Sequence, residues 1–186
     1  MHRSSIPEPE ALLFDLEVGR FRYSRWRNLS IGVWAGQATL AAVQRVGRIS
    51  QLMVKDYPHG HSNVAFVLDG VPAPTPEAQG AFSRVFDERN SDLSCTAIVV
   101  EGTGFWASSM HSAITGMRLA ASGSMRLRLH STIDEVLKWL PGVHLQRTGV
   151  ELDPEHMRRV LQTARKLGAT GTSAEQAAVA TALSLS

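Results

Sequence analysis

Three side chains of one segment, Ser108, Ser109 and His111, are of the types that a serine hydrolase uses. Such an enzyme needs an exposed nucleophile, usually on a Gly-x-Ser-x-Gly turn, a histidine base and an acid that orients the base. The turn and the orienting acid are both missing from this segment. We therefore expect hydroxyl groups on the surface of a helix beside a solvated histidine, and no catalytic residues.

Two histidines, His59 and His61, lie in one loop, and the chain has a single cysteine, Cys95. A zinc site needs three or four ligands drawn from cysteine, histidine and carboxylate side chains. Cys95 falls at the start of an expected strand, so it does not complete the set. The sequence predicts neither a metal site nor a cofactor.

The segment Glu101-Gly102-Thr103-Gly104 follows an expected strand and precedes an expected helix. Backbone amides at such a position can bind an anion. The segment lacks the later glycine of a dinucleotide fingerprint and the Gly-Lys-Ser/Thr of a P-loop. A tight turn that packs Phe105 and Trp106 onto a sheet is the favoured interpretation.

The net positive charge of the chain is only +2, because 17 Asp and Glu residues nearly balance its 19 Lys and Arg residues. Its one local concentration is Arg20, Arg22, Arg25 and Arg27, which are interspersed with aromatic residues as on a surface for single-stranded nucleic acid. Alternation along a strand sends these side chains to opposite faces. A charged edge strand explains them better, so nucleic-acid binding is not expected.

The length of 186 residues and the hydrophobic fraction of 44% indicate one compact domain with terminal extensions, and exclude disorder throughout. A lone cysteine excludes a disulfide scaffold. No apolar run approaches the roughly 20 residues that span a bilayer, and Met1 to Glu10 has no apolar signal core. We expect a cytoplasmic protein that does not insert into membranes.

The positioning elements begin with a predicted β-hairpin, because residues 21–27 and 29–35 alternate and are separated by Asn28. Short apolar runs at 64–68 and 96–100 predict buried strands, and residues 125–129 predict an edge strand. Residues 1–18 are expected to form an arm that ends in one helical turn.

Helices are expected between these strands. Apolar residues recur every three or four positions from Leu40 to Met53, which predicts a helix of about five turns. Thr75 is expected to cap a second helix at about 76–90. A third helix has Met110, Ile114 and Met117 among its inward residues, and a fourth is capped by Thr132 and stops at Pro141-Gly142.

Two more helices are expected beyond residue 142, at about 153–168 and 174–183. The first carries an apolar stripe that must cover the core, a second copy of the chain or a partner. The stripe consists of Met157, Val160, Leu161, Ala164 and Leu167. Three regions follow: an arm at 1–18, an α/β domain at 19–141 and a C-terminal helical extension at 142–186.

The element order and four segments resemble the STAS superfamily, the fold of bacterial anti-sigma-factor antagonists, and more closely its divergent members with no assigned partner. The four segments are Leu29 to Trp34, Ala65 to Asp69, Ala97 to Gly102 and Ser131 to Leu140. The resemblance covers about Gly19 to Leu140. It implies a mixed sheet of four to five strands with an opening β-hairpin and helices packed on it, plus the helical extension.

In regulatory STAS domains, the strand that corresponds to Ala65 to Asp69 leads into an Asp-Ser-Ser-Gly motif whose serine is phosphorylated. Here the matching stretch reads Thr75-Pro76-Glu77-Ala78, without the serine. Glu77 either imitates a permanently phosphorylated state or is an ordinary first-turn acid, and Thr75 is a phosphoacceptor or simply the N-cap.

The resemblance implies a non-catalytic module for protein–protein contacts in a bacterial regulatory or assembly system. The surface that it implies consists of Asp69, Thr75, Glu77 and Gln79. Two alternatives stay open: an accessory protein that binds a small molecule, peptide or lipid, and an unusual enzyme. An apolar pocket with a few converging polar groups would favour the first alternative, and a pair of titratable groups spaced around a reactant the second. The protein partner and any homo-oligomer stay unidentified.

Overall fold

The computed structural model describes residues 14–17, 20–88, 93–120 and 126–169, and these contain six strands and five helices. In chain order the elements are β1 (Phe14–Glu17), β2 (Phe21–Trp26), β3 (Leu29–Trp34), α1 (Leu40–Asp56), β4 (His61–Val67), α2 (Pro76–Glu88), β5 (Leu93–Val100), α3 (Gly104–Ala120), β6 (Leu127–His130), α4 (Ile133–Thr148) and α5 (Pro154–Ala169). The predicted α/β class is confirmed.

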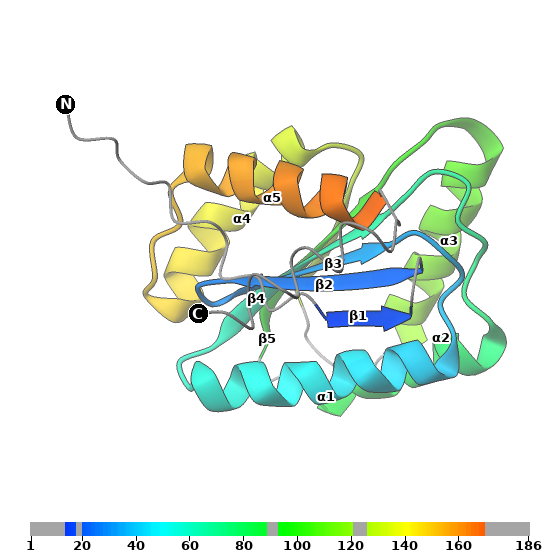
Figure 1. Cartoon of the computed structure of the whole chain (residues 1–186), viewed down its shortest axis with the longest axis horizontal. Coiled ribbons are helices and arrows are strands. Elements are labelled where there is room, and N and C mark those ends of the chain that lie inside the picture. The colour runs from blue at the N-terminus through cyan, green and yellow to red at the C-terminus, as the bar shows by residue number, and fades with distance from the viewer. Residues whose placement is uncertain (1–13, 18–19, 89–92, 121–125, 170–186) are drawn as a thin grey trace, which may run out of the picture.

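The six strands form one mixed sheet in the order β1-β2-β3-β4-β5-β6. The first three strands are antiparallel, which confirms the predicted hairpin, and β3 to β6 are parallel. Because parallel neighbours are joined by crossovers of one hand, helices between successive strands fall on one face. Figure 1 shows α1, α2 and α3 on one side of the sheet and α4 and α5 on the other.

The sheet has one strand more than the four to five expected, because Phe14–Glu17 is extended instead of helical. This strand pairs with β2, so the expectation that the arginine-rich β2 is an edge strand was wrong. Pairing satisfies backbone amides and carbonyls that β2 would otherwise expose along its side. The edge strand predicted at the other end of the sheet is β6.

Helix α4 does not stop at Pro141-Gly142 as expected, but continues to Thr148. Proline removes one backbone donor from a helix but does not end it when tertiary contacts hold the next turn. Those contacts come from His144, which is completely buried. The helix ends at Gly149, whose φ of 70° is a left-handed cap. The boundary expected at 141/142 therefore divides a helix.

The apolar stripe of α5 covers the core of this same chain and is not available as a separate interaction surface. Met157, Val160, Leu161 and Ala164 are buried, and Leu167 is half-buried. The helix packs against β2, β3 and α4. Amphipathic helices bury their apolar face wherever a matching apolar face is free, and here the sheet supplies one. The described part of the extension thus belongs to the α/β domain, whereas the helix expected at 174–183 lies outside the described residues.

Close contacts fix the C-terminal half of α5 on the sheet. A Cβ atom added to Gly168 would lie 2.4 Å from the Cβ of Val33, so only glycine lets the helix approach β3 this closely. Arg165 donates two hydrogen bonds to the Glu101 carboxylate, at 2.6 and 2.7 Å. The Arg22 guanidinium donates to the backbone carbonyl of Leu167.

Two apolar cores follow, one on each face of the sheet. The core under α4 and α5 includes Leu29, Ile31, Phe66, Val99, Leu140, Met157 and Leu161. The core under α1, α2 and α3 includes Phe21, Trp34, Val43, Val67, Ile98, Met110, Ile114 and Met117. On this second face α1 and α2 pack closely against each other and less closely against the strands. That difference in packing creates the candidate site.

Candidate functional site

The face of the sheet that looks toward α1, α2 and α3 carries three rows of side chains that run across β2 to β5. Strand register sets the rows, since residues paired in neighbouring strands point to the same face. The apolar row consists of Phe21, Trp34, Val67 and Val100. The middle row consists of Tyr23, Gly32, Ala65 and Ile98. The polar row consists of Arg25, Ser30, Asn63 and Thr96.

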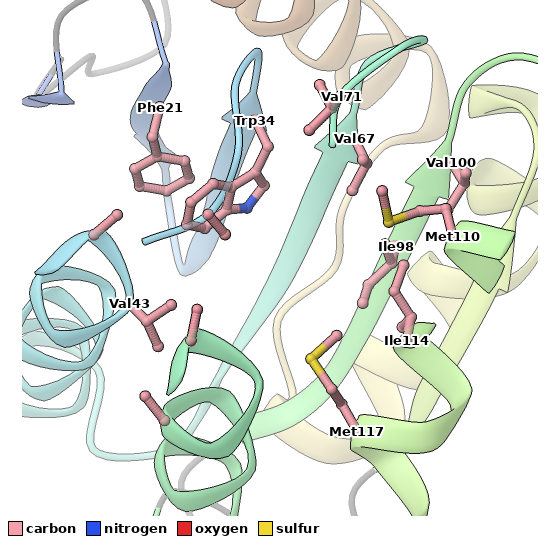
Figure 2. Close-up of a cluster of buried hydrophobic side chains, with 14 of the residues drawn as sticks. Phe21, Trp34, Val43, Val67, Val71, Ile98, Val100, Met110, Ile114 and Met117 are labelled. Atoms are coloured by element: carbon pink, nitrogen blue, oxygen red, sulfur yellow. The ribbon is translucent and has the colours of Figure 1, made fainter. Parts of the chain in front are cut away.

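Small residues in the middle row leave a hollow between the sheet and the helices. Gly32 has no side chain, and a Cβ there would lie 3.0 Å from the Phe21 ring. Ala65, its neighbour in register, adds a single methyl group. The resulting cavity has a volume of about 90 Å³ and is lined by side chains of β2 to β5 and of all three helices. Figure 2 shows apolar side chains such as Trp34 and Met110 around this space.

Two hydroxyl groups at the polar side of the cavity are buried without a hydrogen-bond partner among the described residues. They are those of Tyr23 and Thr96, whose residues are 6% and 1% exposed. Burial raises the pKa of Tyr23, and an interaction with the Ser30 hydroxyl, which does not have the geometry of a full hydrogen bond, offsets part of the rise. The phenol therefore stays neutral. Ser30 itself donates toward the Asn63 side-chain oxygen at 2.9 Å.

The cavity has no charged side chain among the described residues that line it. The cation of the polar row, Arg25, lies outside the lining and is engaged elsewhere. Its guanidinium donates to the Asp56 carboxylate at 2.6 Å and lies over the Tyr57 ring, 5.8 Å from the ring centre. The interior surface is therefore apolar with a neutral hydrogen-bonding strip.

The loop after β4 closes the cavity at the carboxyl ends of the parallel strands. Val71, Pro72 and Pro74 line the cavity from this loop. The indole nitrogen of Trp106 in α3 donates to the Val71 carbonyl at 2.9 Å, and the Gln37 side chain donates to a carbonyl of the same loop at 2.8 Å. The first hydrogen bond connects the loop to α3, and the second connects it to the segment between β3 and α1.

The expected contact residues lie on the outer side of this loop and at the start of α2. Asp69 and Glu77 are exposed, and Gln79 is half-buried, with its side-chain nitrogen donating to the Pro74 carbonyl at 2.9 Å. The predicted N-cap is confirmed, since Thr75 Oγ1 accepts a hydrogen bond from the Ala78 amide at 3.2 Å. The structure brings these four residues to one edge of the sheet, next to the cavity but not within it.

The other candidates do not converge on a site. The Ser108 hydroxyl donates to the Gly104 carbonyl one turn earlier in α3, on the helix surface as expected. His59 is exposed while His61 is buried, so the two rings do not face one ligand. Within the described ranges no three histidine, cysteine or carboxylate side chains are grouped to hold a metal ion.

A buried chain of polar side chains, which sequence analysis missed, joins α4 to the sheet on the opposite face. Ser62 Oγ lies 2.7 Å from His144 Nδ1 and 3.2 Å from the Cys95 sulfur. His144 Nε2 lies 3.0 Å from Asn28 Oδ1, and the Asn28 amide donates to the Gly60 carbonyl at 3.2 Å. Since that carbonyl only accepts, protons are donated in one direction, from the thiol through the serine and histidine to the asparagine.

This buried chain of polar side chains has the side-chain types of a nucleophilic triad, but its members are not accessible to solvent. Ser62, Cys95 and His144 are 0% exposed, so no substrate reaches them. Burial, with a smaller contribution from the charge of Arg27, lowers the pKa of His144 to about 4. The buried chain of polar side chains therefore has a structural role, which is to connect α4 to the sheet. Its members are up to 116 positions apart, and no spacing in the sequence indicates it.

No protein-family model matches this chain, and no curated protein is similar to it in sequence. Among the helices of the described ranges, none combines the length and the apolar character needed to cross a bilayer. What the protein binds therefore has to be argued from the cavity, the buried hydroxyls and the exposed edge.

Proposed function

We propose that this protein binds a small, mainly apolar molecule in the cavity between the sheet and helices α1, α2 and α3, without transforming it. The observation that supports the proposal is a cavity of about 90 Å³ with an apolar lining and two buried, unpartnered hydroxyls, on Tyr23 and Thr96. Apolar walls with a few convergent polar groups are typical of small-molecule sites. Of the functions open from the sequence, the geometry favours this one over a module for protein contacts alone.

The cost of an empty cavity supports the proposal. Sealed voids in protein cores cost about 24 cal/mol per Å³, so this partly open cavity destabilises the empty protein by up to about 2 kcal/mol. Each buried hydroxyl without a partner costs about 1–3 kcal/mol more. A ligand with an apolar body and one hydrogen-bonding group offsets both costs. The geometry thus favours an occupied state.

The absence of catalysis remains part of the proposal. Tyr23 is the only ionisable side chain among the described residues that line the cavity, and burial holds it neutral. Acid–base chemistry needs a second group with a complementary pKa within reach of the reactant. The cavity is therefore suited to holding a molecule, and we expect no turnover there.

Filling the cavity tests the proposal. The substitution Ala65→Leu adds three carbon atoms to the hollow beside Gly32, and we expect it to raise the free energy of unfolding by about 1 kcal/mol. It should also abolish the rise in melting temperature that toluene or phenol produces in the unchanged protein. Calorimetric melting curves with and without each probe measure both effects.

The matched control adds the same side chain to the tightly packed face. Ala97 is completely buried in β5 and faces α4 and α5, so Ala97→Leu should destabilise by about 1–3 kcal/mol and leave the response to the probes intact. Equal destabilisation by the two substitutions would show that no usable space exists beside Ala65.

A protein contact at the outer edge is the second candidate, and one specific observation favours it. Phe105, at the start of α3, was expected to pack onto the sheet but is 89% exposed. It follows β5 as Asp69 follows the parallel strand β4, so the two residues lie at the same edge of the sheet. Aromatic side chains are frequent anchors of protein interfaces, and the fold itself gains nothing from exposing this ring. The resemblance to STAS domains and a bacterial regulatory or assembly role belong to this second proposal.

Charge reversal at Glu77 tests the contact. We expect Glu77→Lys to weaken capture of a protein partner from native lysate, while the free energy of unfolding falls by about 1 kcal/mol or less, because the residue is an exposed first-turn acid. Glu151→Lys reverses another exposed charge and is the control. Partner capture that persists in both Glu77→Lys and Phe105→Ser, measured by quantitative mass spectrometry, would exclude this edge.

A further inference from the structure

The position and surroundings of the two unpartnered hydroxyls define the kind of molecule that the cavity accepts. We infer that the ligand is uncharged, about the size of one ring, and carries a single hydrogen-bonding group that binds Thr96. Its apolar body then packs toward Trp34 and Met110. This inference rests on the proposed function and names its ligand class.

Strand register determines which hydroxyl the hydrogen-bonding group of the ligand can reach. Thr96 and Tyr23 both line the cavity and are more than nine-tenths buried, but β3 and β4 lie between their strands, so one small group binds only one of them. Thr96 is the better partner because the Tyr23 hydroxyl also interacts with Ser30. A hydroxyl donates one hydrogen bond and accepts others, so Thr96 can serve a ligand hydroxyl or carbonyl alike. The remaining polar groups of that strip, on Ser30 and Asn63, already bond to each other.

Charge on the ligand is excluded by the lining. None of the described lining residues carries a charge, and Arg25 is held by Asp56 outside the cavity. A buried carboxylate or ammonium group without a charged partner is strongly disfavoured. The volume of about 90 Å³ is on the scale of cavities that accept benzene, which limits the body of the ligand to about one ring.

Three probes of equal shape but different polarity test the inference: toluene, phenol and benzoate. In titrations of the full chain followed by NMR, we expect phenol to bind about tenfold more tightly than toluene and benzoate not to bind. Thr96→Val and Tyr23→Phe each remove a hydroxyl and keep the shape of the side chain. Thr96→Val should bring the affinity for phenol down toward that for toluene and leave the affinity for toluene unchanged or higher, whereas Tyr23→Phe should leave the preference for phenol intact.

Ser24→Ala is the matched control, because this buried hydroxyl lies on the opposite face of β2. It should leave the preference for phenol intact. Toluene and phenol binding equally tightly, or benzoate binding as well as phenol, would overturn the inferred ligand class while the cavity remained a binding site. If none of the three probes bound, the proposed function would fall together with the inference. Should one hydroxyl variant not fold, the other decides the result.

Discussion

Deletion of residues 142–186 should leave a chain that no longer unfolds cooperatively. The deletion removes the second half of α4 and all of α5, and with them Leu152, Met157, Val160 and Leu161, which are buried against the sheet. Full burial of side chains of this size contributes about 1.5–3 kcal/mol each, so the loss is about 6–12 kcal/mol. A whole domain is stable by only about 5–15 kcal/mol. Denaturant titration followed by circular dichroism measures the outcome.

A chain that ends after residue 169 is the matched control, because it keeps every element that the structure describes. We expect this shorter deletion to retain a single cooperative transition. A cooperative transition in the 142–186 deletion would instead support the boundary that the sequence suggests, with residues 19–141 folding alone. The structure argues against that boundary, since it cuts α4 between Leu140 and His144, both completely buried.

Acidification from pH 6.5 to 4 should destabilise the protein by about 3 kcal/mol through His144 alone. The pKa of this side chain is about 4 in the folded protein, because burial and, to a smaller extent, the charge of Arg27 disfavour its protonated form, and about 6.5 when unfolded. Between these values the unfolded chain binds a proton that the folded protein does not, so stability falls as the pH falls. Burial also lowers the pKa of His130, which contributes in the same direction.

The substitution His144→Gln isolates this contribution. A glutamine amide can accept from Ser62 and donate to Asn28 as the imidazole does, but it does not titrate. Below pH 6.5 the free energy of unfolding of this variant should therefore depend less on pH than that of the unchanged chain. Equal pH dependence of the two proteins, or a His144 pKa near 6.5 measured by NMR, would contradict the explanation.

Elements with a strong local pattern could be predicted from the sequence. The apolar spacing of Leu40–Asp56 gives α1, the hydroxyls of Thr75 and Thr132 cap α2 and α4, and the paired apolar runs give β4 and β5. Each of these patterns depends only on residues that are close together in the sequence. The continuation of α4 past Pro141 could not be predicted, because it depends on the tertiary contacts of His144.

The candidate site was beyond prediction for a different reason. The cavity exists because register places Gly32 beside Ala65, and Thr96 two strands away from Ser30. Each of these residues could be assigned to its own strand, but the sequence of one strand does not determine its register with the neighbouring strands. The location of Asp69 and Glu77 could be predicted, because the first follows the end of one strand and the second begins a helix. That they form a contact surface stays a prediction from the resemblance.

The single thiol at one end of the buried chain of polar side chains can report local opening of the protein. Cys95 is the single cysteine of the sequence, it is completely buried, and burial raises its pKa. Only a thiolate that reaches solvent reacts with a labelling reagent, so the native protein is modified only while the α4 and α5 layer is lifted from the sheet. The rate of labelling of Cys95 under native conditions therefore measures how often this layer opens, and no introduced probe is needed.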